Sequence, residues 1–577
     1  MTVSKVKRNK DRAMPTTIAW RFNVVVGLIC LVFAGIAARA AYIQVIEPDL
    51  LQVRGDNRTI RNASNYSYRG AIVDRNGIEL AISVPVQTVY ADPQRFIRGH
   101  AGQMKKRVHA LAQALDMNVT EITERIGTDD SRRFVYLARH ISPRMAEYIK
   151  QLKIPGIGTR QETKRFYPTA EISAHVVGFT NVDDEGIEGI ERLFNERLTG
   201  IDGKDKYIKD ARGNRIEVLE KVEPVPPEDV VLSIDQRIQT LAYKELKAAI
   251  KSFQAASGSA VVLDVHSGEI LAMVNGPSYN PNNRSNVAVH RFRNRAITDT
   301  FEPGSTMKPL TILSALELGS KRKDDIIDTS PGWMRIGGRR VSDPRNYGEL
   351  SLTEVLIKSS NMGSTRIAME IPKEFLLSKF FEMGFAEDTG SGLIGESSGQ
   401  LSDRPRWSQF ELAALSYGYG LAITPLQLAR FYATIGNGGK KVPLSILKDP
   451  QFNQGEQVLD AYNTRAVLEM MEQVVLEGAP KAKVAGYRVA GKTGTVRKAT
   501  AGGYGNEYMG IFAGVAPVSD PRLAVVVVIN EPGGDDYHGG EVAAPVFSRI
   551  MGGALQHLNI APDDATLITQ ATRGLGD

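Results

Sequence analysis

The sequence predicts a mixed α/β (α+β) protein whose largest domain contains a mostly antiparallel sheet covered by helices. Two pairs of adjacent apolar segments predict β-hairpins, one within residues 260–274 and one within residues 511–529. Between them, apolar residues recur at helical spacing, which predicts covering helices. The chain has 577 residues, more than a single hydrophobic core usually serves, so several domains are expected.

An apolar segment near the N-terminus predicts a membrane helix at residues 22–40. Its core, FNVVVGLICLVFAGIAA, carries no charge and is long enough to cross most of a hydrocarbon layer. Basic residues gather in the preceding tail, residues 1–21, so the positive-inside rule predicts a cytoplasmic tail and an exported remainder. The alternative is a cleaved signal peptide ending near Ala40, but the apolar run exceeds the usual signal core.

Composition argues against several kinds of site. The single cysteine, Cys30, lies in the apolar segment, so no intramolecular disulfide is expected. The eight histidines are scattered and no HExxH pattern occurs, so neither a metal site nor a cofactor is expected. The net charge of +6 is small for this length and is partly placed in the N-terminal tail, so nucleic acid is not an expected partner.

Two segments of different character follow the membrane helix. Residues 41–222 are charged and mixed, with a tight turn at Asn76-Gly77, and predict an elongated non-catalytic pedestal domain. The sequence EPVPP at residues 223–227 favours extended backbone and marks a domain boundary. Residues 223–560 form the predicted catalytic domain, and residues 561–577 a flexible polar tail.

The catalytic domain is predicted to begin with a strand at residues 229–234, followed by an amphipathic helix over residues 238–253. The first hairpin turns at His266-Ser267-Gly268, and the second at Ser519-Asp520-Pro521. Helical stretches are predicted at residues 352–358, 412–415, 426–435 and 466–476. These elements give the sheet its predicted helical cover.

The segment FEPGSTMKPL, residues 301–310, brings a serine and a lysine together. Pro303-Gly304 favours a helix that begins at Ser305, and residues three apart then share one helix face. The Lys308 amine can reach the hydroxyl, and a helix N-terminus favours developing negative charge on it. The same S-x-x-K spacing also begins at Ser4, Ser320 and Ser445, so this pair alone does not establish a nucleophile.

Two further short patterns follow in order along the chain. Ser359-Ser360-Asn361 is predicted to leave one helix and enter another, where Ser359 and Asn361 could equally be helix caps. Lys492-Thr493-Gly494 fits a strand that a ligand approaches closely, or simply an exposed edge strand. Each pattern has an ordinary structural explanation when it is taken alone.

The ordered set S-x-x-K, S-x-N and K-T-G is the active-site signature of penicillin-binding proteins and serine β-lactamases. The sequence resembles the class B penicillin-binding proteins, and most closely the division-specific D,D-transpeptidases of the penicillin-binding protein 3 type. The resemblance runs over nearly the whole chain and includes RGAIVDRNG at residues 69–77, GIEGIE at 186–191, NRA at 294–296 and YGYG at 417–420.

The resemblance implies a role for each residue of the motifs. Ser305 would attack a D-Ala-D-Ala stem peptide, with Lys308 as its base and Ser359 as the proton relay. The resemblance also places the backbone N–H groups of Ser305 and Thr495 at the oxyanion. Asn361 would hold the substrate amide, and the terminal carboxylate would be bound by Lys492, Thr493 and Thr495, beside Gly494. By a looser alignment Arg497, Tyr508 and Tyr537 would line the pocket, although His538 stands where several relatives have an aromatic residue.

The implied function is the cross-linking of peptidoglycan during septum formation, by an enzyme held in the inner membrane with its catalytic domain in the periplasm. Implied partners are stem peptides, β-lactams as covalent inhibitors, a polytopic glycan polymerase and other division proteins. An elongation-type transpeptidase and a D,D-carboxypeptidase remain alternatives within the superfamily. An inactive division scaffold or a β-lactam sensor is the alternative outside it. No E-x-x-x-N element occurs between Asn361 and Lys492, which argues against a class A β-lactamase.

Overall fold

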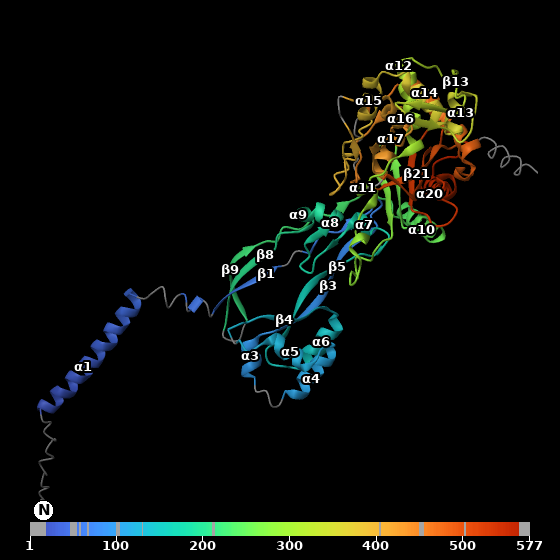
Figure 1. The fold of residues 1–577 in the computed structure, drawn as a ribbon. Coiled ribbons are helices and arrows are strands. Elements are labelled where there is room, and N and C mark those ends of the chain that lie inside the picture. The colour runs from blue at the N-terminus through green and yellow to red at the C-terminus, as the bar shows by residue number, and fades with distance from the viewer. Residues whose placement is uncertain are drawn as a thin grey trace, which may run out of the picture. The chain divides into compact units, whose positions relative to one another are not determined.

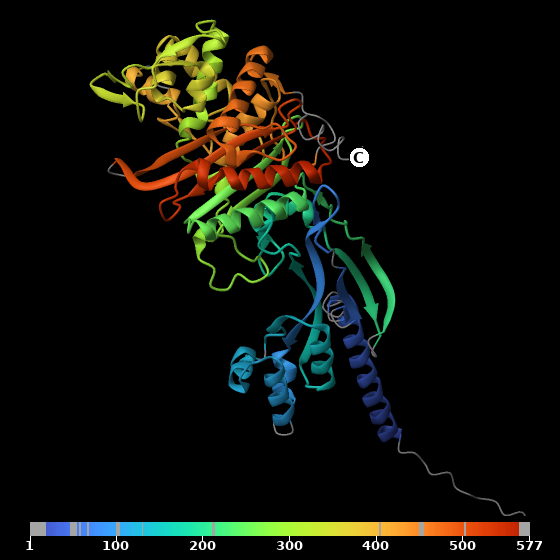
Figure 2. The same cartoon turned by 90° about the vertical axis from the view of Figure 1, so that its right-hand side faces the viewer.

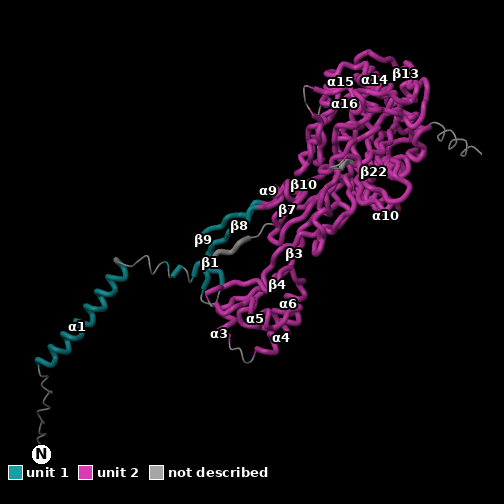
Figure 3. The backbone as a smooth tube through the Cα atoms, in the orientation of Figure 1, with its two compact units in different colours: residues 1–67, 201–225 teal, residues 68–200, 226–577 magenta. Residues whose placement is uncertain are grey.

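The protein was analysed as a computed structural model that describes residues 19–564, without 47–52, 54, 57–58, 66–67, 100–103, 130, 211–213, 403–405, 449–454 and 501–502. The chain forms two compact units, residues 1–67 with 201–225 and residues 68–200 with 226–577 (Figure 3). Most of the predicted cytoplasmic tail and of the predicted C-terminal tail lies outside the described residues.

The first unit contains the predicted membrane helix. Helix α1 (Ala19–Ala41) continues into a π-helical turn, η1 (Tyr42–Ile46), and its described side chains are exposed almost throughout. It is long and apolar enough to cross a membrane, as predicted, and begins three residues before the predicted start. The unit also holds a three-stranded antiparallel sheet in the order β1-β8-β9, built from β1 (Ile60–Asn65), β8 (Gly203–Lys209) and β9 (Arg215–Val222).

The second unit begins with a mixed α/β region before the catalytic domain. Its sheet has the order β10-β2-β3-β4, with β5 also paired to β3, and comprises β2 (Ile72–Val73), β3 (Glu79–Ala91), β4 (Val135–Ile141), β5 (Ile157–Phe166) and β10 (Val230–Val231). Four helices share a small apolar core with β3 and β4: α3 (Pro93–Arg98), α4 (Lys105–Ala114), α5 (Val119–Ile126) and α6 (Pro143–Gln151). The predicted turn at Asn76-Gly77 joins β2 to β3, and Gly77 has a φ of 83°.

The strand predicted at residues 229–234 is shorter than expected. Of the predicted strand, only Val230 and Val231, which form β10, pair with β2, and they pair in parallel. Beyond Leu232 the backbone turns to other partners: the Ser233 N–H donates to Ile446 O and the Asp235 N–H to Leu271 O. The predicted amphipathic helix follows as α10 (Gln236–Ser252), and the Asp235 side chain caps it.

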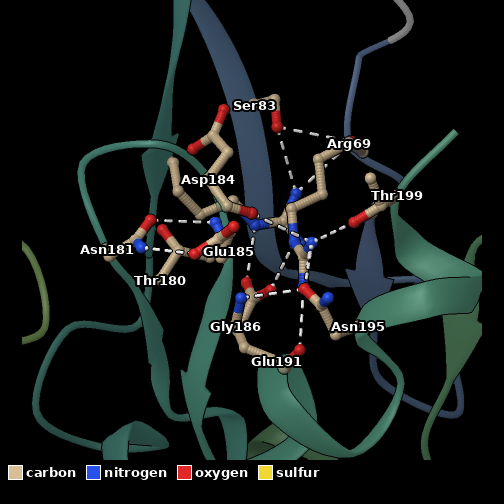
Figure 4. A network of polar contacts seen from close by, with 12 residues as sticks. Arg69, Ser83, Thr180, Asn181, Asp184, Glu185, Gly186, Glu191, Asn195 and Thr199 are labelled. Atoms are coloured by element: carbon tan, nitrogen blue, oxygen red, sulfur yellow. Dashed lines mark hydrogen bonds and ion pairs between the residues drawn. The ribbon is translucent and has the colours of Figure 1, made fainter. Parts of the chain in front are cut away.

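A buried charged network holds the short elements after β5 together (Figure 4). These elements are β6 (Phe179–Thr180), β7 (Gly186–Glu188), α8 (Gly189–Leu193) and α9 (Asn195–Leu198), which follow the short helix α7 (Ala174–Val177). Glu191, fully buried, accepts hydrogen bonds from Arg69 Nε at 2.7 Å and from Arg165 Nε at 2.6 Å. Arg69 also donates to the side chains of Asn195 and Thr199. Burial of three charges is tolerated because each is paired and hydrogen-bonded.

The catalytic domain is built on a five-stranded antiparallel sheet in the order β12-β11-β23-β22-β21. Its edge strand β21 is labelled in Figure 1. The strands are β11 (Ser257–Asp264), β12 (Ile270–Gly276), β21 (Ala490–Thr500), β22 (Gly503–Ala516) and β23 (Leu523–Asn530). Both predicted hairpins are confirmed, with β22 longer than predicted. Alternate residues of β23 lie in two different hydrophobic clusters, so this strand is buried on both faces.

Helices cover both faces of this sheet. Helix α10 and α20 (Ala544–His557) lie side by side on one face, as Figure 2 shows. Helix α17 (Pro425–Gly436) contacts β11, β22 and β23 from the cluster on the other face. The prediction of a mostly antiparallel sheet covered by helices is confirmed.

The remaining elements complete this part of the chain. The helices and helical turns are η2 (Val289–Arg291), α11 (Arg295–Thr298), η3 (Gly304–Met307), α12 (Lys308–Leu318), α13 (Leu352–Ile357), α14 (Asn361–Met369), α15 (Lys373–Glu382), α16 (Gln409–Ser416), α18 (Ala461–Gln473), η4 (Val474–Gly478), η5 (Pro480–Ala482) and α19 (Gly539–Val542). Short strand pairs are β13 (Ile326–Asp328) with β16 (Glu349–Ser351), β14 (Trp333–Ile336) with β15 (Arg339–Ser342), β17 (Gln400–Leu401) with β18 (Leu421–Ala422), and β19 (Lys440–Lys441) with β20 (Glu456–Gln457). Helices were predicted at the positions of α13, α16, α17 and α18, and all four are present.

Candidate active site

Ser305 lies in a 3-10 turn, η3, directly before helix α12. The prediction that the α-helix begins at Ser305 is therefore wrong by three residues. An α-helix starting there would need an N–H on residue 309 to donate to Ser305 O, and Pro309 has none. The Lys308 N–H donates to Ser305 O instead, which closes the tighter turn. Ser305 is half-buried at the end of a buried helix.

The second motif lies between two helices, as predicted. Helix α13 ends at Ile357 and α14 begins at Asn361. Ser359 has a φ of 55°, in the left-handed region that non-glycine residues rarely adopt. Ser360 is the N-cap of α14, and its hydroxyl accepts from the Gly363 N–H at 2.8 Å. The strained turn directs the side chains of Ser359 and Asn361 to the same lysine.

Lys308 is the centre of the site. Its Nζ lies 3.1 Å from Ser305 Oγ, 3.2 Å from Ser359 Oγ and 2.8 Å from Asn361 Oδ1. The side chain has no exposed surface. Burial, and then the nearby positive charge of Lys492, hold the pKa of Lys308 well below its ordinary value, while Asp343 acts in the opposite direction. A lower pKa increases the share of the neutral amine that a base requires.

Lys492 approaches the same hydroxyl from the edge strand β21. Its Nζ donates to Ser359 Oγ at 3.1 Å, and its exposed fraction is 1%. Burial lowers the pKa of Lys492 to about 7. Ser359 Oγ thus lies between the two lysine nitrogens, which share a site with almost no access to water.

Glycine lets β21 pass close to the nucleophile turn. A Cβ at Gly494 would lie 3.0 Å from Thr306 Cγ2 and 3.2 Å from Pro303 O, so a larger residue would push the strand away from Ser305. Thr495, next along the strand, accepts a hydrogen bond on its hydroxyl from the Gly539 N–H at 3.0 Å. The K-T-G motif therefore lies on the edge strand against η3.

Three residues predicted by a looser alignment also come together. Arg497 Nε donates to Tyr508 OH at 2.9 Å, across the β21–β22 pair. The rings of Tyr508 and Tyr537 stack with centroids 4.1 Å apart, and His538 meets Tyr537 edge-on. The structure groups these aromatic side chains near the end of β21 that follows the K-T-G motif.

Three residues that support the motifs were not predicted as site residues. Asp343 is buried, and its carboxylate accepts from Ser360 Oγ at 2.5 Å and from the Asn361 N–H at 2.6 Å. Tyr432 OH, from α17, donates to Thr306 O at 2.9 Å. Gly418 approaches so closely that a Cβ there would lie 2.0 Å from Gly304 O. The YGYG sequence was a signal for Gly418, whereas no local pattern marks Asp343 or Tyr432.

The arrangement is suited to acyl transfer. It provides a serine hydroxyl beside an enclosed amine, a second hydroxyl linked to that amine, and a second buried lysine on the edge strand. Within the described residues, no group of three or more His, Cys, Asp or Glu side chains is placed to hold a metal ion.

Two family profiles match the chain. The "Penicillin binding protein transpeptidase domain" matches residues 258–552, and the "Penicillin-binding Protein dimerisation domain" matches residues 64–232. The first match contains all three motifs, and the second covers the mixed region that precedes the catalytic sheet.

Curated relatives and solved structures agree with these matches. The peptidoglycan D,D-transpeptidase FtsI of Escherichia coli strain K12 is 46% identical over 565 residues, 97% of this chain and 95% of the relative. A peptidoglycan synthetase from Bifidobacterium adolescentis has a TM-score of 0.70 at 26% identity, covering 88% of this chain and 98% of that one. Penicillin-binding protein 3 from Mycobacterium tuberculosis, solved with aztreonam, has a TM-score of 0.67 at 26% identity and covers 87% and 98%. The chain belongs to the penicillin-binding protein family of transpeptidases.

Proposed function

We propose that this protein is a serine-type peptidoglycan D,D-transpeptidase that cross-links stem peptides during septum formation. The observation that carries the proposal is the convergence of Ser305, Ser359 and Asn361 on the enclosed nitrogen of Lys308. The division role is supported by similarity to FtsI over 97% of the chain.

In the acylation step, the neutral Lys308 amine takes the proton from Ser305 as its oxygen attacks the carbonyl of the penultimate D-alanine. Asn361 holds the substrate amide, and the backbone N–H groups of Ser305 and Thr495 face the developing oxyanion. Loss of one such donor costs about 3 kcal/mol in comparable enzymes. The proton then passes through the Ser359 hydroxyl to the nitrogen of the leaving D-alanine.

Substrate recognition depends on the edge strand. The terminal carboxylate binds Lys492, Thr493 and Thr495, in bonds that charge strengthens. An arriving carboxylate also favours the protonated form of Lys492, whose pKa of about 7 in the empty site leaves it free to gain or lose a proton. Arg497, Tyr508 and Tyr537 line the outer part of the pocket.

In the second step an amine from a neighbouring stem peptide attacks the ester on Ser305. Lys308, by microscopic reversibility, accepts the proton of that amine and returns one to Ser305. The absence of an E-x-x-x-N element between Asn361 and Lys492 leaves no recognised base to direct water onto the ester. β-Lactams, which resemble the D-Ala-D-Ala end, should therefore leave a long-lived adduct.

The membrane helix places this chemistry outside the cytoplasm. Basic residues before α1 orient the tail to the cytoplasm and the catalytic domain to the periplasm. The proposed protein partners, a polytopic glycan polymerase and other division proteins, would meet the helix and the pedestal.

Intact-protein mass after incubation with penicillin tests the proposal. The native protein should gain the mass of one penicillin for many minutes, and Ser305→Ala should gain none. Rapid release of hydrolysed penicillin would instead indicate a β-lactamase, and an adduct on Ser305→Ala would overturn the assignment of the nucleophile.

A further inference from the structure

A small, strongly basic hairpin lies behind the S-x-N motif. It consists of β14 and β15, residues 333–342, and we call it the arginine hairpin. Its two strands join at Gly337-Gly338, with φ values of 55° and 82°, the conformation of a tight hairpin turn. Ile336 and Val341 are buried, while Trp333, Arg335, Arg339 and Arg340 are exposed.

The charge on the exposed face does not help the hairpin to fold. Arg335 lies directly opposite Arg340 in the strand register, and like charges in that position are destabilising. Within the described residues, no carboxylate forms an ion pair with Arg335, Arg339, Arg340 or Arg345. Asp343, the one acidic residue in 333–345, points inward and is bound to the start of α14. The positive charge is therefore left uncompensated.

An aromatic ring on the exposed face holds one of these arginines in place. The Arg340 guanidinium lies 5.0 Å from the centroid of the Trp333 ring, and both side chains share the face of Arg335. Arg339 pairs with Ile336, so its side chain lies on the other face, 5.0 Å from the ring centroid of Phe410. Stacking limits the freedom of the side chain while its N–H groups remain available. The planar guanidinium fork suits bidentate binding of carboxylates, so the face is arranged for anionic partners.

The buried side of the hairpin contacts the catalytic machinery. Ile336 and Val341 form one hydrophobic cluster with Met362, Ala413 and Tyr417. Met362 follows Asn361 in the first turn of α14, and Asp343 follows the last residue of β15. A ligand on the exposed face would thus sit directly behind the helix that supplies Asn361.

We propose that the exposed face of the arginine hairpin is a docking surface for the acidic stem peptides of a glycan strand. The proposal rests on the proposed function, which brings such strands to this domain. Stem peptides end in carboxylates and repeat along the strand, so several negative charges meet several arginines at once. Docking of peptides beside the reacting one keeps the strand at the site between successive cross-links.

Binding is tested on full-length protein in detergent, acylated with penicillin so that the active site itself cannot hold substrate. The probe is a fluorescent glycan strand that carries uncross-linked stem peptides. The double variant Arg335→Gln/Arg340→Gln should bind it at least tenfold more weakly than the native protein. Arg322→Gln/Lys323→Gln removes the same charge from two other exposed positions and should bind within twofold of the native protein.

Two further experiments distinguish stem peptides from other anionic partners. Strands whose stem-peptide carboxylates have been converted to amides should bind poorly to every variant. Equal binding of amidated strands, or unchanged binding by the hairpin variant, would overturn the proposal. If the hairpin variant loses binding to phosphatidylglycerol vesicles but still binds the glycan strand, the exposed face contacts a membrane instead.

Stability and acylation provide the remaining controls. Arg335→Gln alone removes one of the two facing charges, so its melting temperature should equal or exceed that of the native protein, with strand binding at least threefold weaker. The rate of Ser305 acylation by penicillin should stay within twofold in the hairpin variants. If penicillin fails to acylate the native protein, the proposed function is refuted. The docking proposal is then tested separately, by comparing strand binding of the unacylated native protein with that of the unacylated hairpin variant.

Discussion

The two buried lysines provide a quantitative test of the site, through the substitution Lys492→Met. The nitrogens of Lys308 and Lys492 lie 3.2 Å and 3.1 Å from the same Ser359 oxygen, so they are at most about 6.3 Å apart. Two unit charges at that separation repel each other by about 2.6 kcal/mol at an effective dielectric constant near 20. That energy corresponds to about 2 pKa units.

The direction of the expected pKa shift of Lys308 follows from the positive charge on Lys492. The charge on Lys492 disfavours protonated Lys308 and lowers its pKa. Its removal should raise the pKa of Lys308, so a higher pH is needed to obtain the neutral amine. We expect the acid limb of the acylation profile to move up by about 2 pH units, along with a lower maximum rate because a carboxylate ligand is lost.

The assay is the second-order rate of acylation by a fluorescent penicillin, measured between pH 5 and pH 10 at constant ionic strength. Thr493→Val is the matched control, since it removes a proposed carboxylate contact without changing charge. Thr493→Val should lower the maximum rate of acylation and leave the pH of the acid limb unchanged. An unchanged limb in Lys492→Met would refute the electrostatic coupling of the two lysines.

Four other outcomes are expected. Lys308→Arg replaces an amine of lowered pKa with a guanidinium that cannot lose its charge near neutral pH, so acylation should be abolished; near-normal acylation by a variant that circular dichroism shows to be folded would exclude Lys308 as the base. Glu191→Gln leaves two buried arginines without their carboxylate and should lower the free energy of unfolding by about 3 to 5 kcal/mol in denaturant titrations, and a loss below about 1 kcal/mol would contradict this account. Because the pKa of Lys492 is about 7 when folded and about 10.4 when unfolded, the unfolded chain binds more protons in that window; the free energy of unfolding should rise from pH 7 to pH 10, and rise less in Lys492→Met. A reporter that is active only outside the cytoplasm should work when fused after Val53, and activity of a strictly cytoplasmic reporter there would reverse the topology.

The central strands of the sheet were predictable because a strand that is buried on both faces is apolar along almost its whole length. The β23 strand, LAVVVVIN, is almost wholly apolar, and such a run bounded by turn residues predicts a buried strand. The S-x-N segment was also predictable as a junction between two helices, although the residue that caps α14 is Ser360 and not Ser359 or Asn361, the two caps that the sequence suggested. These signals are local, so one sequence is enough to read them.

One local signal was overlooked: α12 starts at Lys308 because of Pro309. The other features that were not predicted depend on partners far away in the chain. The shortening of the strand after Asp229 depends on Ile446 and Leu271, which compete for its backbone. Asp343 supports the motif through hydrogen bonds to residues 17 and 18 positions away, and no spacing rule predicts such a contact.

The enclosure of the two lysines has a consequence for how protons are exchanged with the surroundings. Lys308 and Lys492 expose 0% and 1% of their surface, and Ser359 Oγ contacts both nitrogens. Because both nitrogens are enclosed and linked through one hydroxyl, a proton taken from Ser305 has a direct path along these side chains to the leaving amine. The incoming amine then replaces that proton in the second half of the cycle. Reactants and products thus carry the protons of one turnover, and at a fixed pH the rate of the reaction should not depend on the concentration of buffer.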